Sequence, residues 1–171
     1  MPPVEPFSLS VIICTRDRAP QLERCLQKFK GTQTFRKSWE LIVVDNNSLD
    51  DTKAVIQKFA TSAPFHVRYL FEGRQDLSHA RNRGIAETSS SIIAFTDDDC
   101  LVDRQWASTI VREFSTDRSL AVLGGRVEPG DPNGQTGTRT FSDRKQITSS
   151  QELFSRMIGC DMAFSRKVLK S

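Results

Sequence analysis

The sequence lacks the features that identify several common classes of protein. It has four cysteines (Cys14, Cys25, Cys100 and Cys160) but no CxxC pair, which favours reduced thiols over a zinc site or a disulfide framework. No apolar run approaches the roughly 20 residues of a membrane-spanning helix, and "MPPVEPFSLS" has neither region of a signal peptide. We therefore expect a cytoplasmic protein without a transmembrane segment, whose membrane contact, if any, is peripheral and at the inner surface.

A strong charge of one sign is also missing. The chain has 24 lysines and arginines against 21 aspartates and glutamates, a formal net charge of +3. That excess is too small to indicate a nucleic-acid partner, and no stripe of arginines and aromatics supports one. Apolar residues make up 37% of the 171 residues, which is ordinary for one globular domain with its own core.

Short apolar runs alternate with segments of helical periodicity. They predict strands at 9–14, 40–45, 66–72, 91–96 and 120–128, and helices at 20–31, 50–60, 77–89 and 103–115. Asp50 or Asp51 is expected to cap the second helix, and Ser78 the third. The alternation predicts an α/β fold with a Rossmann-like, mostly parallel, doubly wound sheet and helices on both faces.

The pattern weakens after Glu128. The segment "PGDPNGQTGT" is a loop by composition, and "MIGCDMAFSRKVLKS" resembles a strand that enters a very short helix. We therefore divide the chain into residues 1–128, an α/β half, and residues 129–171, the beginning of a second region that looks truncated.

Polar side chains follow three of the predicted strands. Thr15 follows the first strand in "CTRDR", Asp45 ends the second in "VDNNSLDD", and Asp97, Asp98 and Asp99 end the fourth in "TDDD". Ligands of open α/β sheets bind beyond the carboxyl ends of the strands. The sequence therefore predicts a ligand site built from these tips.

The aspartate cluster needs either solvent or a positive charge, because neighbouring carboxylates repel one another. Asp97 and Asp99 point the same way if the extended geometry continues for one more step. They would then bind Mg²⁺ or Mn²⁺, whose other ligands are water and substrate phosphates. The alternative interpretation is a solvated acidic turn, with Asp103 capping the next helix.

Five segments resemble, in order, the blocks of glycosyltransferase family 2: "SVIICTRDR", "LIVVDNNSLDDT", "LSHARNRGIAETSSSIIAFTDDDC", "GGRVEP" and "GCDMAFSRKVL". The resemblance runs from about Ser8 to the end of the chain. It implies a GT-A fold, a nucleotide-diphosphate sugar donor such as a UDP-sugar, a Mn²⁺ or Mg²⁺ ion, and inversion at the anomeric carbon. The implied acceptor is a carbohydrate or glycolipid hydroxyl, as in polysaccharide biosynthesis.

The resemblance also implies a role for each aspartate of the cluster. Asp97 and Asp99 match the DxD motif of the family, with Asp97 toward the ribose and the metal and Asp99 on the metal. Asp98 can share either task. A cation at the diphosphate would stabilise the charge that develops on the leaving group.

Three further positions match nucleotide-binding positions of the family. Thr15 would contact the nucleotide, Asp45 would accept the N–H of the base, and Arg81 would lie near the nucleotide. Each has a structural alternative: a hydroxyl bonded to the backbone for Thr15, an Asx turn for Asp45, and a solvated helix residue for Arg81.

The acceptor side departs from the family. An inverting transferase needs a general base, and family members take it from an acidic block downstream of the "MAF" segment, which this chain does not contain. Asp161 is the candidate base inside the acceptor-side block, and the catalytic base is otherwise unknown. We expect a fragment of a longer enzyme, which by itself binds a sugar nucleotide but transfers its sugar very poorly.

Other functions remain open at this stage. One is a nucleotide-sugar-binding module without turnover, which the missing base favours. Others are a Mg²⁺-dependent nucleotidyltransferase or a phosphatase of the haloacid dehalogenase type. A nucleotidyltransferase would have a glycine-rich loop after the first strand, and "TRDRAPQ" lacks the glycines. The phosphatase would have its nucleophilic aspartate directly after the first strand, and Asp17 in "CTRDR" comes too late.

Overall fold

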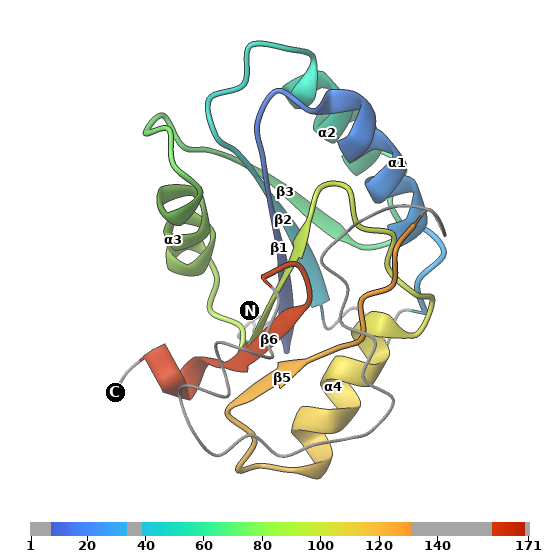
Figure 1. Cartoon of the computed structure of the whole chain (residues 1–171), viewed down its shortest axis with the longest axis vertical. Helices are drawn as coiled ribbons and strands as arrows, with labels where there is room; N and C mark the ends of the chain where they lie inside the picture. The colour runs from blue at the N-terminus through green and yellow to red at the C-terminus, as the bar shows by residue number, and fades with distance from the viewer. Residues whose placement is uncertain (1–7, 34–38, 131–158, 170–171) are drawn as a thin grey trace, which may run out of the picture.

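The computed structural model describes residues 8–33, 39–130 and 159–169 (Figure 1). The elements, in chain order, are β1 (Leu9–Thr15), α1 (Ala19–Phe29), β2 (Trp39–Asp45), α2 (Thr52–Ala60), β3 (His66–Phe71), α3 (Leu77–Glu87), β4 (Ile92–Asp97), α4 (Trp106–Thr116), β5 (Val122–Gly124), β6 (Met162–Ser165) and the short 3₁₀ helix η1 (Arg166–Leu169). The alternation of strand and helix from β1 to α4 follows the sequence pattern.

The strands form one six-stranded sheet in the order β3-β2-β1-β4-β6-β5. Strands β1 to β4 run parallel to their neighbours, whereas β6 is antiparallel to both β4 and β5. The prediction of a mostly parallel α/β sheet is confirmed, and β6 is the strand that runs against its neighbours. Strand β6 reaches the sheet by a long connection from β5, and local sequence does not specify the direction of such a strand.

The predicted strand at 120–128 is much shorter in the structure. The strand itself covers only Val122–Gly124, and Val127 forms an isolated bridge beyond it. A Cβ atom on Gly125 would collide with the carboxylate of Asp161, so this close approach favours glycine. The strand thus ends within the "GG" pair.

Alternate residues of the central strands build two cores. Leu9, Val11 and Ile13 pack toward α1, α2 and α4 on one side of the sheet. On the opposite side, Ile12 packs with Ala80 of α3. Figure 1 shows α3 alone on its side of the sheet. Both faces of β1 and β2 are covered, so these strands read as continuous apolar runs.

One of the two predicted helix caps differs in the structure, and the other agrees with it. Helix α3 begins at Leu77, and its N-cap is Asp76, whose Oδ1 accepts a hydrogen bond from the Ser78 N–H at 2.7 Å. The Ser78 prediction is therefore wrong by two residues. At α2, the N-cap position is Asp51, but the side chain that accepts a bond from the first turn is Asp50, 3.0 Å from Thr52 N.

The predicted second region joins the same sheet, since β6 lies between β4 and β5. The division of the chain at residue 128 stays a prediction about the donor and acceptor sides. Within the described ranges, no helix is long and apolar enough to cross a bilayer. All four cysteines are free thiols, and only Cys25 is fully buried.

Candidate functional site

A pocket of about 390 Å³ lies where the strand order reverses, at the carboxyl ends of β1 and β4. This switch point is where open α/β sheets bind their ligands. The lining residues come from four parts of the chain: Cys14, Thr15, Arg16, Arg18, Asn46, Gln75, Asp76, Leu77, Ala80, Asp97 and Asp98. Of the site residues expected from the sequence, Thr15, Asp97 and Asp98 line this pocket.

Asp98 is the buried member of the aspartate cluster. Its Oδ2 accepts a hydrogen bond from the Thr15 hydroxyl at 2.7 Å, and its Oδ1 lies 3.0 Å from Nη1 of Arg18. Burial raises the pKa of the Asp98 carboxyl, while the Thr15 hydrogen bond and the Arg18 charge act in the opposite direction. Asp98 thus holds the tips of β1 and β4 together.

Asp97 and Asp99 lie on either side of this anchor. Strand β4 ends at Asp97 and a turn follows, so the extended geometry does not continue to Asp99. The Asp97 carboxylate is half-exposed and lies 3.9 Å from Nη2 of Arg81, and Asp99 is exposed and lies 2.7 Å from Nη2 of Arg18. Burial raises the pKa of Asp97, with the Arg81 charge opposing it.

These carboxylates fit one mode of metal binding. No group of three or more His, Cys, Asp or Glu side chains in the described part of the chain is arranged to enclose a cation. Asp97 and Asp99 nevertheless offer hard oxygen donors beside a pocket. One or two carboxylates suffice for Mg²⁺ or Mn²⁺ when water and substrate phosphates supply the remaining ligands.

Asp45 lies at the tip of β2, next to the pocket rather than among its lining residues. Its Oδ1 accepts a hydrogen bond from Ser48 N at 2.9 Å. This bond forms an Asx turn, the structural alternative considered for Asp45. Its Oδ2 accepts one from the Tyr69 hydroxyl at 3.0 Å. Each carboxylate oxygen can accept a second bond, so base recognition by Asp45 stays a prediction.

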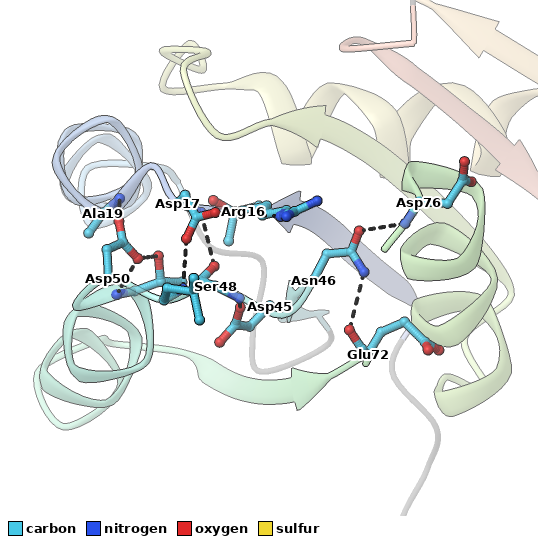
Figure 2. A network of polar contacts seen from close by, with 12 residues as sticks. Arg16, Asp17, Ala19, Asp45, Asn46, Ser48, Asp50, Glu72 and Asp76 are labelled. Atoms are coloured by element: carbon cyan, nitrogen blue, oxygen red, sulfur yellow. Dashed lines mark hydrogen bonds and ion pairs between the residues drawn. The ribbon is translucent and has the colours of Figure 1, made fainter. Parts of the chain in front are cut away.

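Asn46 fixes the wall of the pocket formed by residues 75–77. This buried amide donates to the carbonyls of Glu72 and Arg74 at 3.1 and 2.7 Å, and its Oδ1 accepts from Asp76 N at 3.0 Å. Figure 2 shows Asn46 between the end of β3 and the start of α3. One side chain thus satisfies three backbone groups of the connecting loop.

The β1–α1 and β2–α2 loops are joined to each other beside the pocket. Asp17 has a φ of 52°; its N–H donates to Ser48 Oγ at 3.0 Å, and its Oδ1 accepts from Leu49 N at 2.7 Å. Oδ2 of Asp50 accepts from Ala19 N, the first residue of α1, at 2.9 Å. These contacts, drawn in Figure 2, hold both loops in place.

Asp161, the candidate base, lies outside the pocket lining. Its Oδ1 accepts a hydrogen bond from the Trp106 indole N–H at 2.8 Å. Burial raises the pKa of Asp161 in spite of this bond. Nearby Gly159 closely approaches Arg81, since a Cβ there would lie 2.9 Å from its Nη2. The segment before β6 thus borders Arg81, which itself pairs with Asp97.

The structure adds two residues that the sequence analysis missed. Arg18 supplies the positive charge on the aspartate cluster, and Asn46 fixes the loop before α3. The need for a cation near "TDDD" could have drawn attention to the arginines of "CTRDR". The role of Asn46 gives no local signal, because its partners follow it by 26 to 30 residues.

Comparison with known proteins agrees with this arrangement. The family model described as "Glycosyl transferase family 2" matches residues 10–171. The chain belongs to glycosyltransferase family 2. Its relatives include glycosyltransferase AglE of Haloferax volcanii, 34% identical over 155 residues that cover 90% of this chain and 50% of AglE. The chain therefore spans about half the length of this curated relative.

Solved structures share the fold. The mannosyltransferase PcManGT of Pyrobaculum calidifontis, in complex with GDP-Man and Mn²⁺, aligns with a TM-score of 0.72 at 20% identity, covering 98% of this chain and 48% of that one. TarS of S. aureus, residues 1–349 with UDP-GlcNAc, aligns at 0.76 and 16%, covering 96% and 47%. The expected GT-A fold of the family is confirmed.

Proposed function

We propose that this family 2 chain forms the donor-binding part of an inverting, metal-dependent glycosyltransferase that uses a nucleotide-diphosphate sugar. The observation that carries the proposal is the pocket at the β1–β4 switch point, whose lining includes Thr15, Arg18, Asp97 and Asp98. UDP is the nucleotide that we choose as the probe, because the resemblance to the family favours a UDP-sugar.

Residues in and beside the pocket would hold such a donor in different ways. Asp97 and Asp99 would hold Mn²⁺ or Mg²⁺, which when bound neutralises the charge that builds up on the departing nucleoside diphosphate. Asp98 keeps the two strand tips at a fixed separation through Thr15 and Arg18. Arg81, placed over the Phe95 ring at 5.4 Å, adds a positive charge beside Asp97.

On the acceptor side, the chain offers one candidate residue, Asp161. Transfer with inversion requires a base that takes the proton from the acceptor hydroxyl. Asp161 is the candidate that we keep, since burial raises the pKa of its carboxyl and thereby its basicity. A carbohydrate or glycolipid acceptor, and contact of the enzyme with the inner membrane surface, remain predictions from the family resemblance.

The proposal is tested by calorimetric titration of UDP into the chain, with Mn²⁺ and with a chelator. We expect Mn²⁺ to strengthen UDP binding to the wild-type protein, and the Asp97→Asn and Asp99→Asn variants to lose most of this gain. The reason is that each substitution replaces a charged cation ligand with a weaker neutral one.

The matched control is Asp51→Asn, which removes the same charge from an exposed position outside the pocket. It should retain the full effect of Mn²⁺. Equal UDP affinity with Mn²⁺ and with chelator in the wild type would exclude the metal role. The absence of any UDP binding would count against the donor site as a whole, once GDP had also been tried.

A further inference from the structure

Arg18 makes a contact that bears on how the aspartate cluster binds a cation. Its guanidinium spans two successive carboxylates, with Nη1 3.0 Å from Asp98 Oδ1 and Nη2 2.7 Å from Asp99 Oδ2. The two carboxylates differ in their surroundings, because the side chain of Asp98 is 5% exposed and that of Asp99 is 51% exposed. Arg18 therefore occupies the charge-compensating position at Asp99 that a bound cation would also need.

The backbone on both sides of Arg18 is fixed. The preceding residue, Asp17, is bonded to the β2–α2 loop through Leu49 and Ser48, and the following residue, Ala19, donates its N–H to Asp50. The backbone at Arg18 is therefore held in place, while its side chain is 42% exposed. Arg18 also lines the pocket, so its guanidinium lies within reach of a ligand there.

We infer that Arg18 is a positioning residue that competes with the divalent cation for Asp99, so that metal and donor diphosphate bind cooperatively. In the free protein the guanidinium neutralises Asp99 and opposes the approach of a second positive charge. A diphosphate in the pocket gives Arg18 another anionic partner, which suits the planar fork of a guanidinium. Asp99 is then released to the cation. This inference rests on the proposed function.

Arg18→Gln tests the exchange because it removes the charge and keeps a polar side chain. The readout is binding of Mn²⁺ alone, measured by the loss of the free Mn²⁺ signal in electron paramagnetic resonance and by calorimetry. We expect Arg18→Gln to bind Mn²⁺ about tenfold more tightly than the wild type, within the range of ordinary coupling between sites. The gain in Mn²⁺ affinity caused by UDP should shrink correspondingly.

Arg16→Gln is the matched control. Arg16 lines the same pocket and carries the same charge, but it pairs with Asp17 at 3.5 Å instead of with the cluster. It therefore reports the general effect of removing one positive charge, and the Mn²⁺ affinity of this variant should rise much less. Arg18→Lys keeps the charge but loses the fork, so it should fall between the wild type and Arg18→Gln.

The outcomes separate the two proposals. Equal Mn²⁺ affinities of Arg18→Gln and Arg16→Gln, with UDP binding still dependent on Mn²⁺, would overturn the competition and leave the proposed function intact. Weaker Mn²⁺ binding in Arg18→Gln would also overturn it, because Arg18 would then only hold the ligands in place. UDP binding that ignores Mn²⁺ in every variant would overturn both. Should Arg18→Gln fail to fold, Arg18→Lys carries the comparison.

Discussion

Asp45 shows how one side chain can have a structural task at the edge of a binding pocket. Its carboxylate closes a turn with Ser48 and accepts the hydroxyl of Tyr69. The pKa of Tyr69 is raised to about 12, first by burial and then by the hydrogen bond to Asp45 and the negative charge of Asp45. The two side chains thereby couple β2 to β3 at the tip where the base of a nucleotide is expected.

This coupling can be measured because Tyr69 is the only tyrosine in the chain. We expect an ultraviolet titration of the native protein to give a phenol pKa of about 12. Asp45→Ala should lower this pKa part of the way toward the ordinary value of about 10, because burial remains. A group with a raised pKa stabilises the fold below its unfolded pKa. The stabilising contribution of Tyr69 is therefore complete below pH ~10 and is lost toward pH 12.

The same substitution addresses base recognition. If Asp45 accepts the N–H of the base, Asp45→Ala should weaken UDP binding by roughly 1–3 kcal/mol. Tyr69→Phe serves as the control, since it keeps the Asp45 carboxylate and should retain most of the affinity. A folded Asp45→Ala protein with unchanged UDP affinity would show that Asp45 only forms the turn.

At the scale of elements, Asp50 serves two helices at once. Oδ2 accepts from Ala19 N at the start of α1, and Oδ1 accepts from Thr52 N at the start of α2. Burial acts to raise the pKa of Asp50, but the hydrogen bonds from Thr52 and Ala19 outweigh it, so the pKa is lowered. One carboxylate therefore fixes the relative placement of two helix N-termini, in addition to the packing of α1 against α2.

We expect Asp50→Ala to reduce the free energy of unfolding by roughly 1–3 kcal/mol, because one lost helix cap costs about 0.5–2 kcal/mol. The measurement is urea unfolding followed by circular dichroism. Asp51→Ala is the control, since Asp51 has no side-chain cap bond, and it should change the stability by less than about 0.5 kcal/mol. Equal effects of both substitutions would contradict the shared cap.

At the scale of the whole molecule, residues 159–169 join the central sheet through β6. Phe164 of β6 is buried, and its ring lies 5.8 Å from that of Phe95 on β4. Arg166 follows β6 and donates through Nε to the Ser90 carbonyl at 2.6 Å. Because β6 separates β4 from β5, its loss would leave β5 without its neighbour in the sheet.

This arrangement predicts a single cooperative unfolding transition. Phe164→Ala should lower the free energy of unfolding by about 3–5 kcal/mol, the usual cost of truncating a buried phenylalanine. Circular dichroism and the fluorescence of Trp39 and Trp106 should shift together, because both tryptophans pack in the same core as the sheet. Leu169→Ala, at an exposed position of η1, should have little effect. Separate midpoints for the two probes would contradict one cooperative unit.

Much of the fold and part of the site could be predicted from local sequence. The apolar runs of β1, β2 and β4 are strands because both of their faces are buried. Thr15, Asp97 and Asp98 were placed at the pocket because parallel strands end at a common edge. These conclusions depend on interactions within a few residues, or on rules that apply to every sheet of this class.

The tertiary structure decided the rest, since it depends on contacts between residues far apart in the chain. The antiparallel position of β6 follows from its pairing with β4. The pairing of Arg18 with Asp99 joins residues 81 positions apart, and the bond from Trp106 to Asp161 joins residues 55 apart. No periodicity in the sequence encodes such a pair, because each partner has an ordinary local environment until the sheet brings them together.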